Sequence, residues 1–424
     1  MRSGALVVLI LGITALAQDS PKLGSHSETK SVTVPITVDH NRVLIDVDLP
    51  LPDGSTKRIH GWVDNGNPDL HLSRRAAALM ELAVTCDDHA CSAPPPHEIT
   101  IGGMKISLAA VKKAIIPLPV AAVAVMFPGL SAEINVPSAV LRNYDVLINL
   151  PDRELTIAQP GTLQFKGVKT KVIVNRGNGL IQVPSQVENK KYNLALDLGS
   201  SISFLSEELF DKLSIAHPYW PHMIGAIGPA NLWGTDDEPK WNLMRVDRVQ
   251  YGPLFLTEVA VVDISKDRMT FFEKRAGVST AGLLGANALV NYRVGLDYSH
   301  SVVYFDIGRL FNFPEFDVIG LILRPEDDGR FTVLGVADYD GKPTASQGQD
   351  DVQAGDHLVA VGGIPVLGYT MGQVWSMLGG SPGMERQLTV ERGGKQFTVV
   401  TKVQHFLGDA PEENQAQKGS GKKD

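Results

Sequence analysis

The chain has 424 residues, of which 43% are hydrophobic and 20% are charged, and its formal net charge is −8 at pH 7. This length predicts about two to four domains with substantial cores, and the negative charge argues against nucleic acid as the main partner. The sequence contains no H-E-x-x-H, G-x-S-x-G or phosphate-loop motif, which disfavours metal-dependent and serine-dependent hydrolases.

The first seventeen residues, MRSGALVVLILGITALA, are typical of a secretory signal peptide. A positive start precedes an apolar stretch and an Ala-Leu-Ala site that fits cleavage after Ala17. No apolar stretch reaches the ~18 residues that a membrane-spanning helix needs. We therefore expect a periplasmic or extracellular protein that meets a membrane only if residues 1–17 stay uncleaved. Residues 18–31 are expected to be a flexible lead-in.

Strand signals begin at Ser31, where β-branched and polar residues alternate. Pro-Asp-Gly at 52–54 predicts a hairpin turn between two strands, and the second strand ends at Asp64. The same order of features returns in KTKVIVNRGNGLIQVPSQVENKKYNLAL, which ends directly before Asp197. Each acid is followed two positions later by a glycine, as in a sharp turn.

The two acid-bearing segments belong to an internal duplication. IHGWVDNGNPDLHL aligns with YNLALDLGSSISF at an offset of 133, and LRNYDVLINLPDRELTI aligns with LVNYRVGLDYSHSVVYF at an offset of 148 through a shared Asn-Tyr-x-Val. A short helix is expected after each acid, in SRRAAALMEL and SEELFDKL. Such a repeat of short strands predicts an all-β dominated fold with two barrel-like units: a first lobe at 32–160 and a second lobe at 161–309.

Cys86 and Cys91 are the two cysteines of the chain, and they enclose DDHA. In an oxidising compartment this spacing favours a local disulfide that closes a small loop. A metal site that uses His89 is the less favoured alternative, because the stretch offers too few further ligands. We therefore expect no metal and no cofactor.

Two later segments have their own character. Residues 217–241, HPYWPHMIGAIGPANLWGTDDEPKW, are rich in Gly, Pro and Trp, and are read equally well as a mobile hairpin over a cleft or as an ordinary loop. Residues 315–405 form a separate C-terminal module. The tail at 408–424 has almost no apolar residues and is expected to be disordered.

The two lobes resemble the aspartic peptidases of the retropepsin and pepsin type, in which each lobe contributes one carboxylate to a shared pair. The resemblance rests on the two Asp-x-Gly turns and on Gly282-Leu283-Leu284-Gly285, which is similar to the hydrophobic-hydrophobic-Gly element beside the catalytic turn in that family. It implies a bilobal acid-protease-like fold with Asp64 and Asp197 as catalytic residues. The supporting residues would be Asn65, Gly66, Asn67, Gly199 and Ser200, with Ser200 and Asn67 bonded to the outer oxygens of the acids.

The chain departs from that family at the middle position of both turns, where the family has Thr or Ser. Asn65 can still donate and accept hydrogen bonds, whereas the side chain of Leu198 can do neither. In the first lobe, Asn135-Val136-Pro137 stands where the second lobe has Leu283-Leu284-Gly285. Both acids remain, but the scaffold that positions them is altered.

The C-terminal module resembles a PDZ domain, a β-sandwich with helices, through Ala354-Gly355-Asp356-x-Leu358 and Val361-Gly362-Gly363. The resemblance implies that an extended peptide, including a protein C-terminus, adds as a strand beside Ile319 to Leu323, with the C-terminal carboxylate held by backbone N–H groups. The residues that would line this groove are Ile319, Gly320, Leu321, Ile322, Val374 and Leu378.

Taken together, the sequence favours a secreted or periplasmic aspartic endopeptidase that acts on peptide or protein substrates through an Asp pair and an activated water. The competing interpretation is a catalytically inactive peptide-binding protein on the same scaffold. A third possibility is that the chain works only as a homodimer, which the duplicated acid makes less necessary. A working pair requires the carboxyl groups of Asp64 and Asp197 within hydrogen-bonding reach, whereas a separation near 10 Å would favour the binding interpretation.

Overall fold

The computed structural model describes residues 29–88, 91–117, 131–310, 315–339, 342–343 and 351–408. The predicted signal peptide, most of the lead-in, His89 and nearly all of the predicted tail lie outside the described residues. Within the described part, no helix is both long enough and apolar enough to cross a membrane.

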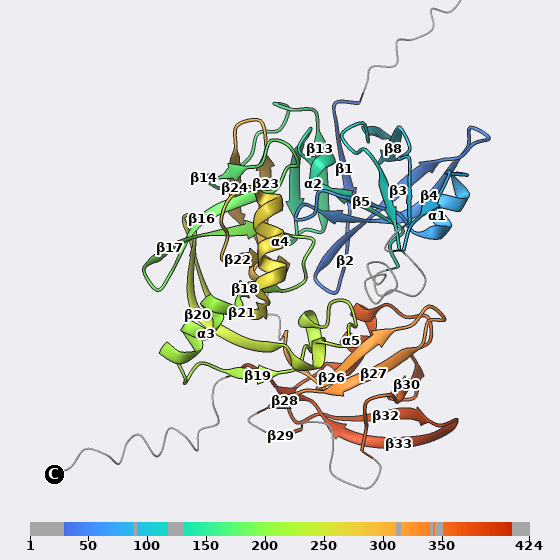
Figure 1. Ribbon diagram of the computed structural model, residues 1–424, viewed down its shortest axis with the longest axis vertical. Helices are drawn as coiled ribbons and strands as arrows, with labels where there is room; N and C mark the ends of the chain where they lie inside the picture. The colour runs from blue at the N-terminus through green and yellow to red at the C-terminus, as the bar shows by residue number, and fades with distance from the viewer. Residues whose placement is uncertain are drawn as a thin grey trace, which may run out of the picture.

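The chain is mostly β, which confirms the predicted fold class. Figure 1 shows the first lobe in blue to teal, the second lobe mainly in green and yellow, and the C-terminal module in orange and red. The first lobe is built on two sheets, ordered β11-β4-β3-β8-β9 with β2 on β3, and β5-β10-β7-β6. Their strands are β2 (Thr37–Asp39), β3 (Arg42–Pro50), β4 (Thr56–Asp64), β5 (Leu70–His71), β6 (Thr85–Cys86), β7 (Cys91–Ala93), β8 (Glu98–Ile101), β9 (Met104–Ser107), β10 (Ala114–Ile116) and β11 (Ile134–Pro137).

The second lobe repeats this plan in one ten-stranded sheet, in which β17 leads to Asp197 as β4 leads to Asp64. Alongside each of these strands runs a parallel partner, β22 beside β17 and β11 beside β4. The strands of this sheet are β15 (Ile173–Val174), β16 (Ile181–Val187), β17 (Lys190–Leu196), β18 (Ser203–Ser206), β19 (His222–Ile224), β20 (Asn242–Tyr251), β21 (Leu254–Ile264), β22 (Gly282–Leu284), β28 (Asp338–Tyr339) and β29 (Lys342–Pro343).

A six-stranded sheet joins the lobes, in the order β1-β13-β12-β23-β24-β14. At its centre, β12 and β23 pair with Leu147 opposite Gly295, and these residues also correspond at the 148 offset. The two copies of the repeat therefore meet each other about an approximate two-fold axis. The strands are β1 (Ser31–Pro35), β12 (Asp145–Asn149), β13 (Glu154–Ala158), β14 (Val168–Lys171), β23 (Tyr292–Asp297) and β24 (Val302–Ile307).

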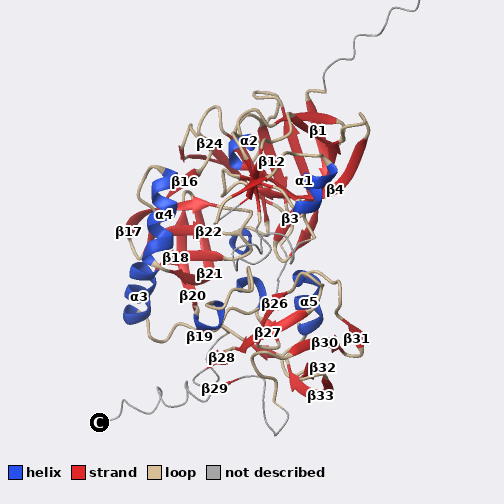
Figure 2. Ribbon diagram, turned by 45° about the vertical axis from the view of Figure 1, so that its right-hand side comes forward, coloured by secondary structure: helices blue, strands red, loops and turns tan. Residues whose placement is uncertain are grey.

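The two predicted helices form after the acid-bearing turns, each separated from its turn by a short strand, β5 or β18, and both begin at a serine cap. Ser73 Oγ accepts the N–H of Ala76 at 2.9 Å, and Ser206 Oγ accepts the N–H of Leu209 at 3.3 Å. Such capping satisfies N–H groups that lack a partner within the helix. Figure 2 shows α3 and α4 along one side of the second-lobe strands. The helices are α1 (Arg74–Leu79), α2 (Ser138–Leu141), α3 (Glu207–Ala216), α4 (Lys266–Ala276) and α5 (Met371–Leu378), with 3₁₀ turns η1 (Gly228–Ala230), η2 (Glu238–Lys240) and η3 (Ala286–Ala288).

The C-terminal module holds a sheet ordered β26-β27-β30-β32-β33, with β31 on β30, and helix α5. It is not separate from the second lobe, because Ile224 of β19 pairs with Asp338 of β28. Buried Phe204 and Ile227 of that lobe also share a hydrophobic core with Ile322. The remaining strands are β25 (Asp317–Val318), β26 (Leu321–Pro325), β27 (Phe331–Val336), β30 (His357–Val361), β31 (Ile364–Pro365), β32 (Glu385–Arg392), β33 (Lys395–Lys402) and β34 (Gln404–His405).

Candidate active site

The turns that follow β4 and β17 bring Asp64 and Asp197 together across the lobe interface. A β-carbon built on Gly66 would overlap the carboxyl group of Asp197. A β-carbon built on Gly199 would lie 2.5 Å from Oδ1 of Asp64 and 3.1 Å from Oδ1 of Asp197. The two Oδ1 atoms are therefore no farther apart than the sum of these distances. Each turn needs glycine because the carboxyl group of the opposite lobe occupies the space of a side chain.

Asn65 ties the two turns to each other. Its Nδ2 donates to the carbonyl oxygen of Leu196 at 2.7 Å, and its Oδ1 accepts the N–H of Leu198 at 2.8 Å. The amide thus both donates and accepts across the interface, and it is fully buried. Leu198, which cannot return such bonds, is fully buried in the hydrophobic core instead. Of the two middle residues of the turns, Asn65 alone therefore makes side-chain hydrogen bonds across the lobe interface.

Different groups hold the two acids. Asp64 accepts Nδ2 of Asn135 at 3.1 Å and is also hydrogen-bonded by the side chain of Asn67. Asp197 Oδ1 accepts the backbone N–H groups of Gly199 and Ser200, at 2.9 and 3.1 Å. The expected bond from the Ser200 side chain does not form, because this hydroxyl donates to the carbonyl oxygen of Ile202 at 2.8 Å. The turn geometry places the backbone N–H, rather than the hydroxyl, against the acid.

Burial raises the pKa values of both acids, and repulsion by Asp197 adds to the rise for Asp64. Asp64 is 2% exposed, and its pKa stands well above the ordinary value, first because of burial and then because of the charge of Asp197. Burial raises the pKa of Asp197 to about 6, against the lowering effect of its two backbone hydrogen bonds. Two such neighbouring carboxyl groups titrate as a unit that holds a proton over a range of pH.

Arg42, at the start of β3, is a buried cation near the two acids. It is 3% exposed, and its guanidinium carbon lies 5.2 Å from the ring centroid of Trp62. Burial lowers its pKa to about 10, while attraction to Asp64 and Asp197 raises it, so the group is charged at neutral pH. Its Nη2 donates to the carbonyl oxygen of Leu232 at 3.3 Å, and Nε has no hydrogen-bond partner among the described residues.

Sequence reasoning missed Arg42 and Asn135 as parts of this site. Asn135 carried a signal, because it places an amide where the other copy of the repeat has the apolar Leu283. Arg42 carried none, since a charged residue beside a hairpin turn is ordinary.

The loop of residues 225–241 lies over this region, and its contacts with the C-terminal module fix its position. Ser201, just beyond the second acid-bearing turn, donates to the carbonyl oxygen of Pro229 at 2.9 Å. Beside Asp197 there remains an apolar cavity of about 20 Å³, lined among others by Phe204 and Phe272. The loop is thus bonded to Arg42 and Ser201 beside the acid pair, and none of its residues line this cavity.

The residues predicted to line a peptide groove are all buried in the C-terminal module: Ile319, Gly320, Leu321, Ile322, Val374 and Leu378. The N–H of Ile319 donates to the carbonyl oxygen of Leu378 at 3.0 Å, and Val318 bridges to Gly379. The start of β26 and the end of α5 are therefore bonded to each other, and the groove is closed at this end.

Cys86 and Cys91 are joined by a disulfide. Among the described residues, no group of His, Cys, Asp and Glu is arranged to hold a metal ion. His89, the possible ligand considered above, is not among those residues.

Comparisons with known proteins add little to this geometry. No family model matches the chain, and no match was found among curated proteins. Among solved structures, the aspartic proteinase from Irpex lacteus is similar with a TM-score of 0.38 and 10% identity, over 66% of this chain and 97% of that chain. A similarity this distant carries no argument about function.

Proposed function

We propose that this chain is an aspartic-type endopeptidase that hydrolyses peptide bonds through Asp64 and Asp197. The observation that carries the proposal is the juxtaposition of two carboxyl groups, that of buried Asp64 and that of partly exposed Asp197, at equivalent turns of a duplicated unit, each facing the glycine of the other turn. Two neighbouring carboxyl groups repel each other unless they share a proton, so a structural salt bridge would not place two acids side by side.

The chemistry requires one ionised and one protonated carboxyl group. The ionised member takes a proton from a bound water, while the protonated member polarises the scissile carbonyl and later protonates the leaving amine. No covalent intermediate is needed. Because the pKa of Asp197 is raised to about 6 and that of Asp64 stands well above its ordinary value, the singly protonated state is populated from about pH 6 upward.

The proposal also covers where the enzyme acts and how it recognises its substrates. The signal-like residues 1–17 support action in the periplasm or outside the cell, and the sequence features of the C-terminal module support recognition of extended peptides by a PDZ-like unit. Asn65 supports a working site despite the loss of hydroxyl groups, since one amide provides both the donor and the acceptor across the interface.

The test is cleavage of a diverse peptide mixture by the purified protein between pH 3 and 8. Asp64→Asn and Asp197→Asn keep the shape of each side chain but remove its ability to ionise, so each is expected to abolish cleavage, by at least ~10³-fold. Asp53→Asn, in the exposed turn between β3 and β4, is the matched control and should cleave normally. Residual cleavage that is equal in both site variants would assign the activity to another site or to a contaminant.

A second candidate function is peptide binding without catalysis. It is favoured by Leu198, whose buried apolar side chain cannot return the hydrogen bonds that Asn65 makes across the interface. In that case the folded protein would cleave nothing at any pH.

A further inference from the structure

The 225–241 loop runs along the edge of the sheet in the C-terminal module that is formed by β26. β26 is the terminal strand of this sheet, so one of its sides has no strand partner among the described residues. A β-carbon on Gly225 would lie 2.9 Å from Cδ1 of Ile322, and one on Gly234 would lie 2.7 Å from Cα of Arg324. Close approach at both positions shows that the loop is seated on β26.

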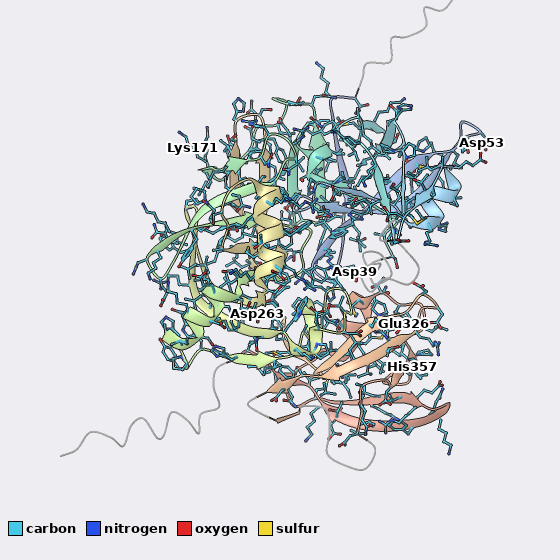
Figure 3. All side chains as sticks on the ribbon, viewed as in Figure 1. Asp39, Asp53, Lys171, Asp263, Glu326 and His357 are labelled. Atoms are coloured by element: carbon cyan, nitrogen blue, oxygen red, sulfur yellow. A yellow bond between two sulfur atoms is a disulfide. The ribbon has the colours of Figure 1, made fainter. Side chains whose placement is uncertain are left out.

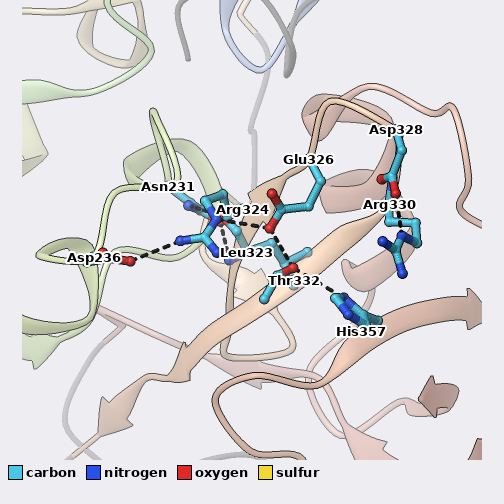
Figure 4. Close-up of polar contacts among 9 residues, drawn as sticks. All are labelled: Asn231, Asp236, Leu323, Arg324, Glu326, Asp328, Arg330, Thr332 and His357. Atoms are coloured by element: carbon cyan, nitrogen blue, oxygen red, sulfur yellow. Dashed lines mark hydrogen bonds and ion pairs between the residues drawn. The ribbon is translucent and has the colours of Figure 1, made fainter. Parts of the chain in front are cut away.

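Asn231 occupies this edge as a neighbouring strand would. Its Nδ2 donates to the carbonyl oxygen of Leu323 at 2.9 Å, and its Oδ1 accepts the N–H of Leu323 at 2.8 Å, as Figure 4 shows. A residue of an antiparallel strand makes the same two bonds with the residue opposite it. Asn231 is 3% exposed, so the side-chain amide has replaced a peptide group in a buried position.

Glu238 holds the loop in the shape that presents Asn231. Its Oε1 accepts the N–H groups of Trp233 and Gly234 at 2.7 and 3.0 Å, and its Oε2 accepts Nδ2 of Asn231. An ion pair between Asp236 and Arg324 at 3.0 Å adds a contact at the rim. The bonds of Glu238 lie within the loop, so they do not depend on the contact of the loop with β26.

The same loop contacts the surroundings of the two acids. The carbonyl oxygen of Leu232 accepts a hydrogen bond from the guanidinium group of Arg42, and the carbonyl oxygen of Pro229 accepts one from the hydroxyl of Ser201. The carbonyl of Ser201 in turn accepts Nδ2 of Asn41 at 3.2 Å. Movement of the loop away from β26 would break the contacts with Leu232 and Pro229, since both residues lie within two positions of Asn231.

The edge of β26 belongs to the segment at which the PDZ-like unit is proposed above to recognise an extended peptide. We propose that the 225–241 loop occupies this edge in the resting chain, and that peptide binding displaces the loop from the edge and from its contacts beside the two acids. The first step rests on the peptide recognition proposed for the C-terminal module, and the second rests on the function proposed for Asp64 and Asp197. The ligand is an internal segment rather than a chain terminus, because the N–H of Ile319 is already bonded to Leu378. A peptide strand offers backbone bonds along the whole edge, whereas Asn231 offers two.

The binding step is tested with a fluorescent heptapeptide of alternating valine and threonine, blocked at both ends. The full chain carries Asp197→Asn so that the probe stays intact. Asn231→Ala is expected to bind the probe about tenfold more tightly or better, because the site is no longer occupied by the loop. Asn231→Asp, which keeps the size of the side chain but loses its donors, should show the same direction. Asn242 lies at the base of the same loop, and its side chain bonds to Asp263 of β21. Asn242→Ala is therefore the control and should leave the affinity for the probe unchanged.

Several results would overturn the binding step. These are equal affinity with and without Asn231, no binding to any variant, or equal binding of a probe whose backbone N–H groups are methylated at alternate residues. Tighter binding of a probe with a free carboxylate would also count against an internal segment and in favour of a chain terminus.

The gating step is tested by hydrogen–deuterium exchange with saturating probe. Uptake is expected to rise in residues 225–241 and in the turn at 197–201. A rise confined to the loop would overturn the coupling to the acids. Because neither readout depends on cleavage, a protein that shows both rises and still cleaves nothing would sink the proposed peptidase function and leave the peptide site standing.

Discussion

Arg42 places a positive charge near the acid pair, which two carboxyl groups alone would lack. A positive charge nearby lowers the pKa of both acids, which opposes the effect of burial. The balance between burial and this cation therefore decides the pH at which one acid is ionised and the other is not.

Removal of that charge is expected to move the pH profile of cleavage. Arg42→Gln should shift the acidic limb of kcat/KM to higher pH by about one to two units, since the loss of a nearby unit charge is worth a few kcal/mol at most. Arg42→Lys keeps the charge and should leave the limb near its original position. A loss of rate in Arg42→Gln without any shift of the limb would mean that the residue only supports the loop through Leu232.

Asn65 is the residue on which the alignment of the two turns depends. Asn65→Ala would leave the carbonyl of Leu196 and the N–H of Leu198 buried without partners, which costs about 1–3 kcal/mol for each group. We expect a loss of a few kcal/mol in the free energy of unfolding, measured by urea denaturation. Asn65→Thr restores one hydroxyl that can donate and accept, and should recover part of this loss. Equal destabilisation by Ala and Thr would show that packing, not hydrogen bonding, holds the turns.

At the scale of elements, the duplication explains why much of the fold could be predicted. The strand, turn and capped helix around Asp64 recur around Asp197, and local rules for turns and caps apply to each copy independently. The pairing of β12 with β23 follows from the same symmetry, because equivalent strands of two copies meet at a two-fold axis. A repeated pattern of residues thus carried information about contacts between distant parts of the chain.

The elements that differ between the copies could not be predicted from the sequence in this way. The 225–241 loop lies outside both pairs of aligned segments of the repeat, so no comparison indicated whether it is mobile or packed. Its position depends on Asn231, Glu238 and the edge of β26, which lies about ninety residues farther along the chain. Composition rich in Gly, Pro and Trp does not distinguish a free flap from a docked one.

At the scale of the whole molecule, buried acids gather where the lobes meet the C-terminal module. Asp39, which Figure 3 places at this junction, accepts the hydroxyl of Thr370 at 2.9 Å. Burial raises the pKa of Asp39 to about 6 and those of Glu238 and Glu315 to about 7. Docking of the module against the lobes is therefore linked to protons.

The sign of this linkage follows from the direction of the shifts. Between the ordinary pKa of a carboxyl group and its raised pKa in the folded protein, the folded state holds more protons than the unfolded state, so stability falls as pH rises. For Glu238 this interval runs from about 4.5 to about 7, and its full effect is on the order of 3 kcal/mol. Below about pH 4.5, the stabilising contribution of protonated Glu238 is fully present.

Glu238→Gln is expected to remove this part of the pH dependence. The free energy of unfolding, measured in urea at pH 4.5 and at pH 8, should fall less between the two values in the variant than in the parent chain, by about 3 kcal/mol. Glu208→Gln, exposed on α3, is the control and should leave the difference unchanged. If Glu238→Gln instead lowers stability equally at both pH values, the residue acts as a neutral clip for Asn231 and the junction is not linked to protons through it. A reduced difference would mean that alkaline pH loosens the same loop that we propose a peptide displaces, so that pH and ligand act on one element.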